Sequence, residues 1–121
     1  MSSLSSFDQA RYKEALHALK NGDESAKTTI AFYKLTGCGG VDVDVDGAIA
    51  LLKERVEEGD GEAMWIWGVC NEHGIGTEKD ETLAEALYCF SGNLGVPLGD
   101  ILSRNIKKGT DSFVVDDWSL L

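Results

Sequence analysis

A short acidic stretch contains the arrangement of residues that most resembles a metal site. Asp42, Asp44, Asp46 and Gly47 take places one, three, five and six of a calcium-binding EF-hand loop. Carboxylate oxygens at this spacing suit Ca²⁺, but place twelve, where a bidentate Glu normally closes the shell, is Lys53. We therefore predict a solvated loop in which an aspartate caps the next helix, with no metal and no other cofactor. A calcium-regulated adaptor that uses Asp42, Asp44 and Asp46 is the alternative.

Residues suited to acid–base or nucleophilic catalysis are few. His17 and His73 are the only histidines, and both fit imidazoles at the surface or at a helix end. The three cysteines, Cys38, Cys70 and Cys89, lack metal-type spacing and fit buried thiols in a reducing compartment. The sequence therefore predicts a cytoplasmic protein that is not an enzyme. The alternative is a small hydrolase or a small-ligand-binding protein that uses the concave groove described below.

The charge balance limits the classes of partner. Of 121 residues, 11 are Lys or Arg and 21 are Asp or Glu, which gives a net charge of −10. Such a surface repels phosphate backbones and anionic lipid, so we expect no nucleic-acid partner and no membrane partner. The longest uncharged stretch, residues 86–99, is shorter than the ~20 apolar residues that span a bilayer. The N-terminus also lacks the pattern of a signal peptide.

The elements that position these residues are predicted to be helices. Apolar residues recur at intervals of three and four, as in Ala63, Trp67 and Cys70, which is the helical period. The chain has 14 glycines and one proline, and the glycines fall between such segments. A glycine just past a helix supplies the left-handed residue that ends it. We predict five or six short helices joined by glycine turns.

The pattern repeats along the chain. Gly22-Asp23-x-x-Ala26 recurs as Gly59-Asp60-x-x-Ala63, at an offset of 37. Gly37-x-Gly39 recurs as Gly74-x-Gly76 at the same offset, and Ala48-x-x-Leu51 recurs as Ala84-x-x-Leu87 at an offset of 36. Periods of about 34 to 40 residues built from two helices are typical of an α-solenoid.

One family has this combination of positions. The segment that contains Ala63, Trp67-Gly68, Gly74-x-Gly76, Asp80, Ala84 and Leu87-Tyr88 resembles the Sel-1-like repeat, a relative of the tetratricopeptide repeat. The resemblance implies an all-α fold: a short right-handed α-solenoid of about two and a half helix–turn–helix repeats. The single domain, residues 1–121, then comprises an orphan helix (8–21), repeat 1 (22–58), repeat 2 (59–95), a partial repeat (96–109) and an apolar, acidic tail (110–121).

The resemblance also implies a function. Members act as non-catalytic scaffolds or adaptors, and the first helix of each pair lines a concave groove that binds a peptide or helix. By position, this face consists of Thr28, Phe32, Leu35, Trp65, Val69, Glu72, Ile101, Asn105 and Lys108. Each triplet is spaced four then three, which places it on one helical face. Alternatively, a short array curls tightly and these side chains form its core.

The C-terminal tail is unusually apolar for a segment with three aspartates. Its apolar side chains are Phe113, Val114, Val115, Trp118, Leu120 and Leu121. A solvated tail is seldom this apolar, so we expect the tail to pack, either as a cap on its own array or in the groove of a second copy. The expected partner is thus another protein or peptide, and a homodimer through the array ends or the tail is a further expectation.

Overall fold

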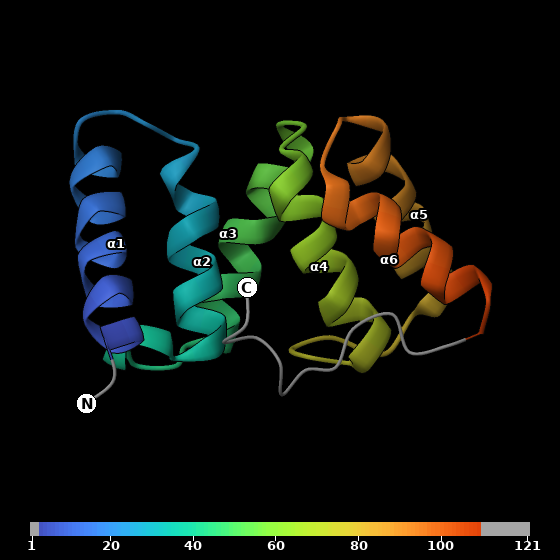
Figure 1. Cartoon of the computed structure of the whole chain (residues 1–121), viewed down its shortest axis with the longest axis horizontal. Coiled ribbons are helices and arrows are strands. Elements are labelled where there is room, and N and C mark those ends of the chain that lie inside the picture. The colour runs from blue at the N-terminus through green and yellow to red at the C-terminus, as the bar shows by residue number, and fades with distance from the viewer. Residues whose placement is uncertain (1–2, 110–121) are drawn as a thin grey trace.

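The computed structural model describes residues 3–109, and this part of the chain is all-helical (Figure 1). The six α-helices are α1 (Ser3–Lys20), α2 (Ala26–Thr36), α3 (Val45–Glu57), α4 (Gly61–His73), α5 (Glu81–Asn93) and α6 (Pro97–Lys107). A single 3₁₀ turn, η1 (Cys38–Gly40), follows α2, and residues 3–109 contain no strand. The predicted all-α class is therefore confirmed for the described residues. The tail at 110–121 lies outside them.

The helices begin and end at residues with a clear physical role. Asp44, Asp60 and Asp80 are the N-caps of α3, α4 and α5, and each carboxylate accepts a hydrogen bond from a backbone N–H of the first turn. Gly37 and Gly74 end α2 and α4 with φ of 74° and 71°, a left-handed conformation that glycine adopts without steric cost. Local signals therefore explain the starts of three helices and the ends of two.

The first helix is longer than expected, because α1 begins at Ser3 rather than at residue 8. Contacts near its start account for part of this extension. The Arg11 guanidinium lies 5.9 Å from the centre of the Phe7 ring, one helical turn away. The Tyr33 hydroxyl donates a hydrogen bond to Asp8 at 3.0 Å and so ties this end of α1 to α2.

Each helix packs against the next one along the chain (Figure 1). In addition, α2 contacts α4 and α4 contacts α6. Most of the core lies between α2 and α6, around Leu52, Val69, Cys70, Tyr88 and Leu102. A smaller cluster of Ala15, Ala26 and Ile30 joins α1 to α2.

Close approach of α4 and α5 depends on Gly68. A Cβ atom at this position would lie 2.6 Å from Cε1 of Tyr88, far inside van der Waals contact. Tyr88 is fully buried, so its ring has little room to move away. Gly68 therefore allows α4 and α5 to pack at close range.

Candidate functional site

Eight of the nine residues predicted to form a concave face lie on α2, α4 and α6, and Lys108 is the C-cap of α6. Because α4 contacts both α2 and α6, the fold does bring the three triplets onto neighbouring helices. The side chains nevertheless differ in burial. Thr28, Leu35, Trp65, Val69 and Glu72 are buried, Phe32 and Asn105 are half-buried, and Ile101 and Lys108 are exposed.

The buried members are involved in the packing of the fold. Leu35, Trp65 and Val69 belong to the hydrophobic core, as the core alternative for these positions predicts. Ile101, by contrast, is 45% exposed and presents an apolar side chain to solvent. The accessible part of the predicted face is therefore concentrated on α6.

Thr28 has a structural partner that the sequence pattern did not identify. Its hydroxyl donates a 2.6 Å hydrogen bond to Asp60, the N-cap residue of α4. The same carboxylate accepts from the backbone N–H groups of Glu62 and Ala63 and lies 3.4 Å from Nε of Arg55. Asp60 thus connects α2, α3 and α4. The only sequence feature that marked Asp60 was the recurrence of Gly22-Asp23 as Gly59-Asp60.

Glu72 lies in a second polar cluster at the end of α4. The hydroxyl of Tyr88 donates a 2.6 Å hydrogen bond to Glu72, and both side chains are buried. Nε2 of His73 lies 4.0 Å from the Glu72 carboxylate and has no hydrogen bond to a described residue. General acid–base catalysis requires such groups to reach a substrate, and Glu72 and Tyr88 are enclosed by the fold. The cluster therefore links α4 to α5.

The acidic loop is organised as a helix start. Helix α3 begins at Val45, so places four to twelve of the EF-hand pattern are helical and cannot wrap around an ion. Asp44 accepts a hydrogen bond from the N–H of Gly47 and caps α3, as predicted, while Asp42 and Asp46 are exposed. Residues 3–109 contain no group of three His, Cys, Asp or Glu side chains placed to hold a metal ion.

This geometry predicts the result of a calcium titration. We expect calorimetry to detect no site with a Kd below about 1 mM, because Lys53 replaces the closing carboxylate and the helix removes the loop. Asp44→Ala serves as the control, since it deletes the carboxylate in the third place. A micromolar isotherm that disappears in Asp44→Ala would contradict the interpretation.

The three cysteines are free thiols with different exposure. Cys70 is fully buried in the core, and burial raises the pKa of its thiol to about 12. Cys38 and Cys89 are half-buried. Because the folded protein retains the Cys70 proton more tightly than the unfolded chain does, this group lowers the free energy of unfolding as the pH rises from about 9 to about 12.

The burial of Cys70 predicts selective thiol chemistry. In the native protein at pH 8, we expect a disulfide reagent such as dithionitrobenzoate to modify Cys38 and Cys89 quickly and Cys70 only after unfolding, because the thiolate is the reactive form. Cys70→Ser should leave the fast phase unchanged and remove the slow one. Rapid modification of all three thiols without unfolding would show that the core around Cys70 opens readily.

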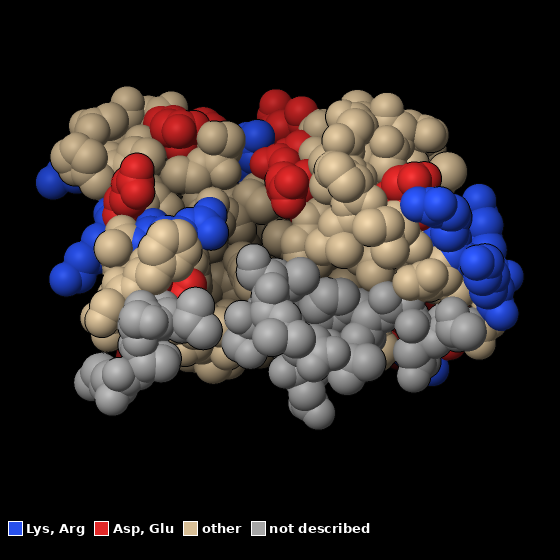
Figure 2. Space-filling model, in the orientation of Figure 1, with Lys and Arg blue, Asp and Glu red and all other residues tan. Residues whose placement is uncertain are grey.

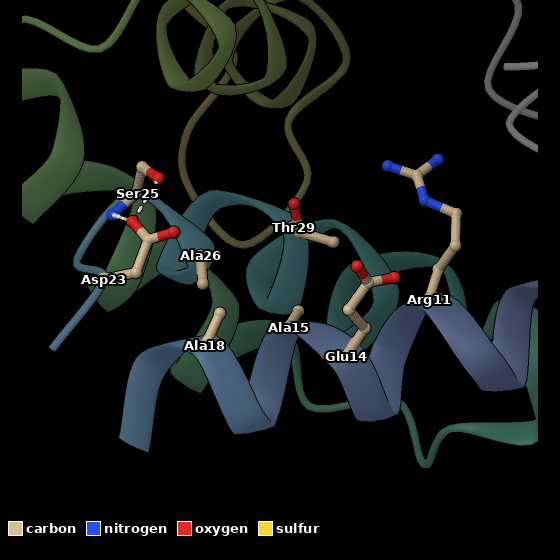
Figure 3. Close-up of a pocket in the computed structure, with 8 residues that line it drawn as sticks. All are labelled: Arg11, Glu14, Ala15, Ala18, Asp23, Ser25, Ala26 and Thr29. Carbon is tan, nitrogen blue, oxygen red and sulfur yellow. Dashed lines mark hydrogen bonds between the residues drawn. The ribbon is translucent and has the colours of Figure 1, made fainter. Parts of the chain in front are cut away.

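A pocket of about 350 Å³ lies between α1 and α2 (Figure 3). Its lining consists of Arg11, Glu14, Ala15, Ala18, Asp23, Ser25, Ala26 and Thr29. Asp23 already accepts hydrogen bonds from the N–H and the hydroxyl of Ser25, so its carboxylate is engaged in the turn before α2. The lining contains no histidine or cysteine, and the Ser25 hydroxyl is held in the turn by Asp23.

An exposed apolar stripe on α5 was not predicted. Leu83, Phe90 and Leu94 are 39%, 61% and 57% exposed and are spaced seven then four, which places them on one side of the helix. The buried residues Ala84, Leu87, Tyr88 and Ser91 lie beside this stripe, on the part of the helix that faces the core. The sequence signal for this second surface was an apolar arc in residues 81–94 that is wider than the part the fold buries.

Comparison of the chain with protein-family models, curated proteins and solved structures found no match. Within residues 3–109, no helix has both the length and the apolar character needed to cross a membrane.

Proposed function

We propose that the chain is a short right-handed array of about two and a half Sel-1-like repeats and acts as a non-catalytic protein-interaction module. It binds a peptide or helix of another protein across the face formed by α2, α4 and α6. The observation that carries the proposal is the order of helix contacts. Each helix packs on the next, and α4 also contacts α2 and α6, as expected where the first helices of successive two-helix repeats lie side by side.

Residues at equivalent places in the two repeats have matching roles, which supports the repeat interpretation. Gly37 and Gly74 both end the first helix of a pair with a positive φ. Asp44 and Asp80 both cap the second helix, and each accepts from the N–H three residues later. Such caps are common at helix ends in general, so the support comes from their spacing: Gly37 and Gly74 are 37 positions apart, and Asp44 and Asp80 are 36 apart.

We expect the contact surface to centre on α6, because the exposed members of the proposed face, Ile101 and Lys108, lie there and at its C-cap. Ile101 provides an apolar contact, and Lys108 provides a positive charge on the same side of the helix. Apolar anchors give most of the free energy of peptide binding, and charged groups at the rim give orientation and association rate. We therefore expect substitution of Ile101 to have the largest effect on binding.

The experiment is an affinity capture from the source cell with matched baits. The baits are the wild-type chain, Ile101→Asp on the proposed face and Leu83→Asp on the α5 stripe; both substitutions introduce one charge at an exposed leucine or isoleucine. We expect a partner that binds directly to wild type and Leu83→Asp, with at least tenfold weaker binding to Ile101→Asp. Circular dichroism should give all three baits the same melting temperature within a few degrees.

Two results would contradict the proposal. One is loss of the partner with Leu83→Asp while Ile101→Asp retains it, which would assign binding to α5. The other is turnover of a small molecule by the purified chain, which would favour the hydrolase alternative.

A further inference from the structure

The surface of α6 combines an exposed apolar residue with a local excess of positive charge. Arg104, Lys107 and Lys108 lie at the end of α6, and all three are exposed. Figure 2 shows this patch in blue at one end of the molecule. In a chain with a net charge of −10, three of the 11 basic residues are thus gathered within five positions, and Lys108 lies on the same side of the helix as Ile101.

These basic groups have few acidic neighbours in residues 3–109. Arg104 forms an exposed ion pair with Asp100 at 3.1 Å, within the same helix. Lys107 and Lys108 form no ion pair with a described residue. An occupant that matches this surface must bring apolar side chains to Ile101 and carboxylates to the lysines.

The segment that follows α6 has this chemistry. Residues 110–121 contain three aspartates, Asp111, Asp116 and Asp117, and no Lys or Arg. They also contain the six apolar side chains from Phe113 to Leu121 named above. The tail thus carries both kinds of side chain that the end of α6 would match.

The chain geometry allows this segment to return over α6. Gly109 ends the helix with φ of 76°, and its N–H bonds to the carbonyl of Ile106, which turns the chain away from the helix axis. Twelve extended residues reach roughly 40 Å, and neighbouring helix axes lie about 8–10 Å apart, so residues 110–121 are long enough to cross from α6 to α2. Attachment to α6 gives the segment an effective local concentration of about 1 mM, which favours its own chain over a second copy.

We infer that residues 110–121 bind in cis to the α2–α4–α6 face, with their apolar side chains on Ile101 and their aspartates near Lys107 and Lys108. This inference rests on the proposed function, because it gives the same face an internal ligand. An external partner must then displace the tail, and it must resemble the tail in being acidic and apolar.

The test is paramagnetic relaxation in the full chain. A nitroxide is attached to Ser119→Cys in a background with Cys38→Ser and Cys89→Ser, while buried Cys70 is retained. We expect the amide signals of Ile101 and Phe32 to lose most of their intensity in the labelled chain. When labelled protein is mixed with a tenfold excess of isotope-enriched protein that carries no nitroxide, the signals of the unlabelled chains should keep their intensity. Phe32 is informative because it is distant from the label in sequence.

Charge reversal provides the matched comparison. Lys107→Glu/Lys108→Glu should reduce the broadening at Ile101 and Phe32 severalfold, whereas Lys13→Glu/Lys20→Glu makes the same change of charge on exposed positions of α1 and should not. The dispersion of the amide spectrum shows directly whether each variant is folded. A second label at Ser112→Cys repeats the measurement if Ser119→Cys perturbs the tail.

Three outcomes would overturn the inference: no broadening at Ile101 and Phe32, broadening strongest over the α5 stripe, or broadening of unlabelled chains by labelled ones. None of these depends on an external partner. The capture experiment with Ile101→Asp and Leu83→Asp therefore continues to test the proposed function separately.

Discussion

Replacement of Gly68 by leucine is expected to lower the free energy of unfolding by about 3 kcal/mol, the upper part of the range for overpacked cores. Even a Cβ at this position would lie 2.6 Å from the Tyr88 ring, and a leucine adds three further carbons in the same space. Since Tyr88 is fully buried, α4 and α5 must move apart to accommodate the side chain. Urea denaturation followed by circular dichroism measures the change.

Two further variants test the cause of that loss. Ala86→Leu enlarges an exposed position of α5 and should change stability by no more than about 0.5 kcal/mol. Tyr88→Ala combined with Gly68→Leu should cost less than the sum of the two single variants, because the smaller residue removes the clash. A Gly68→Leu protein as stable as wild type would show that the two helices do not pack as closely as described.

Removal of the Asp60 carboxylate is the second large effect that we expect. Asp60→Ala should destabilise the protein by about 3 kcal/mol, since an N-cap contributes about 1 kcal/mol and a hydrogen bond to a charged group about 1.5–3 kcal/mol. The substitution removes the cap of α4 and the acceptor of the Thr28 hydroxyl in one step. It also leaves Arg55 without its ion-pair partner among the described residues.

Asp80→Ala is the matched control, because the Asp80 carboxylate caps α5 through a single bond to the N–H of Leu83 and has no other hydrogen bond or ion pair within residues 3–109. The backbone N–H of Asp80, which donates to the carbonyl of Asn71 in α4, is retained in this variant. It should cost about 1 kcal/mol. The coupling between α2 and α4 is measured by Thr28→Val, which should cost less in the Asp60→Ala background than in wild type. Equal losses for Asp60→Ala and Asp80→Ala would mean that Asp60 acts only as a cap.

The sequence by itself determined the features that depend on near neighbours along the chain. The helical period, the glycine that ends α4 at Gly74 and the capping aspartate at Asp44 all involve residues within a turn of each other, so their patterns are visible in a sequence. The prediction that the EF-hand pattern is incomplete followed from Lys53 alone, because it occupies the place of the closing glutamate.

The tertiary structure decided which side chains of those helices are accessible. The spacing of Trp65, Val69 and Glu72 places them on one side of α4, but only the packing of the neighbouring elements determines that they are buried while Ile101 is exposed. Likewise, the Thr28–Asp60 bond joins residues 32 positions apart, and the contact of Glu72 with Tyr88 crosses between two helices. Burial and long-range hydrogen bonding depend on the positions of all helices together, and a helical period specifies only directions around one helix axis.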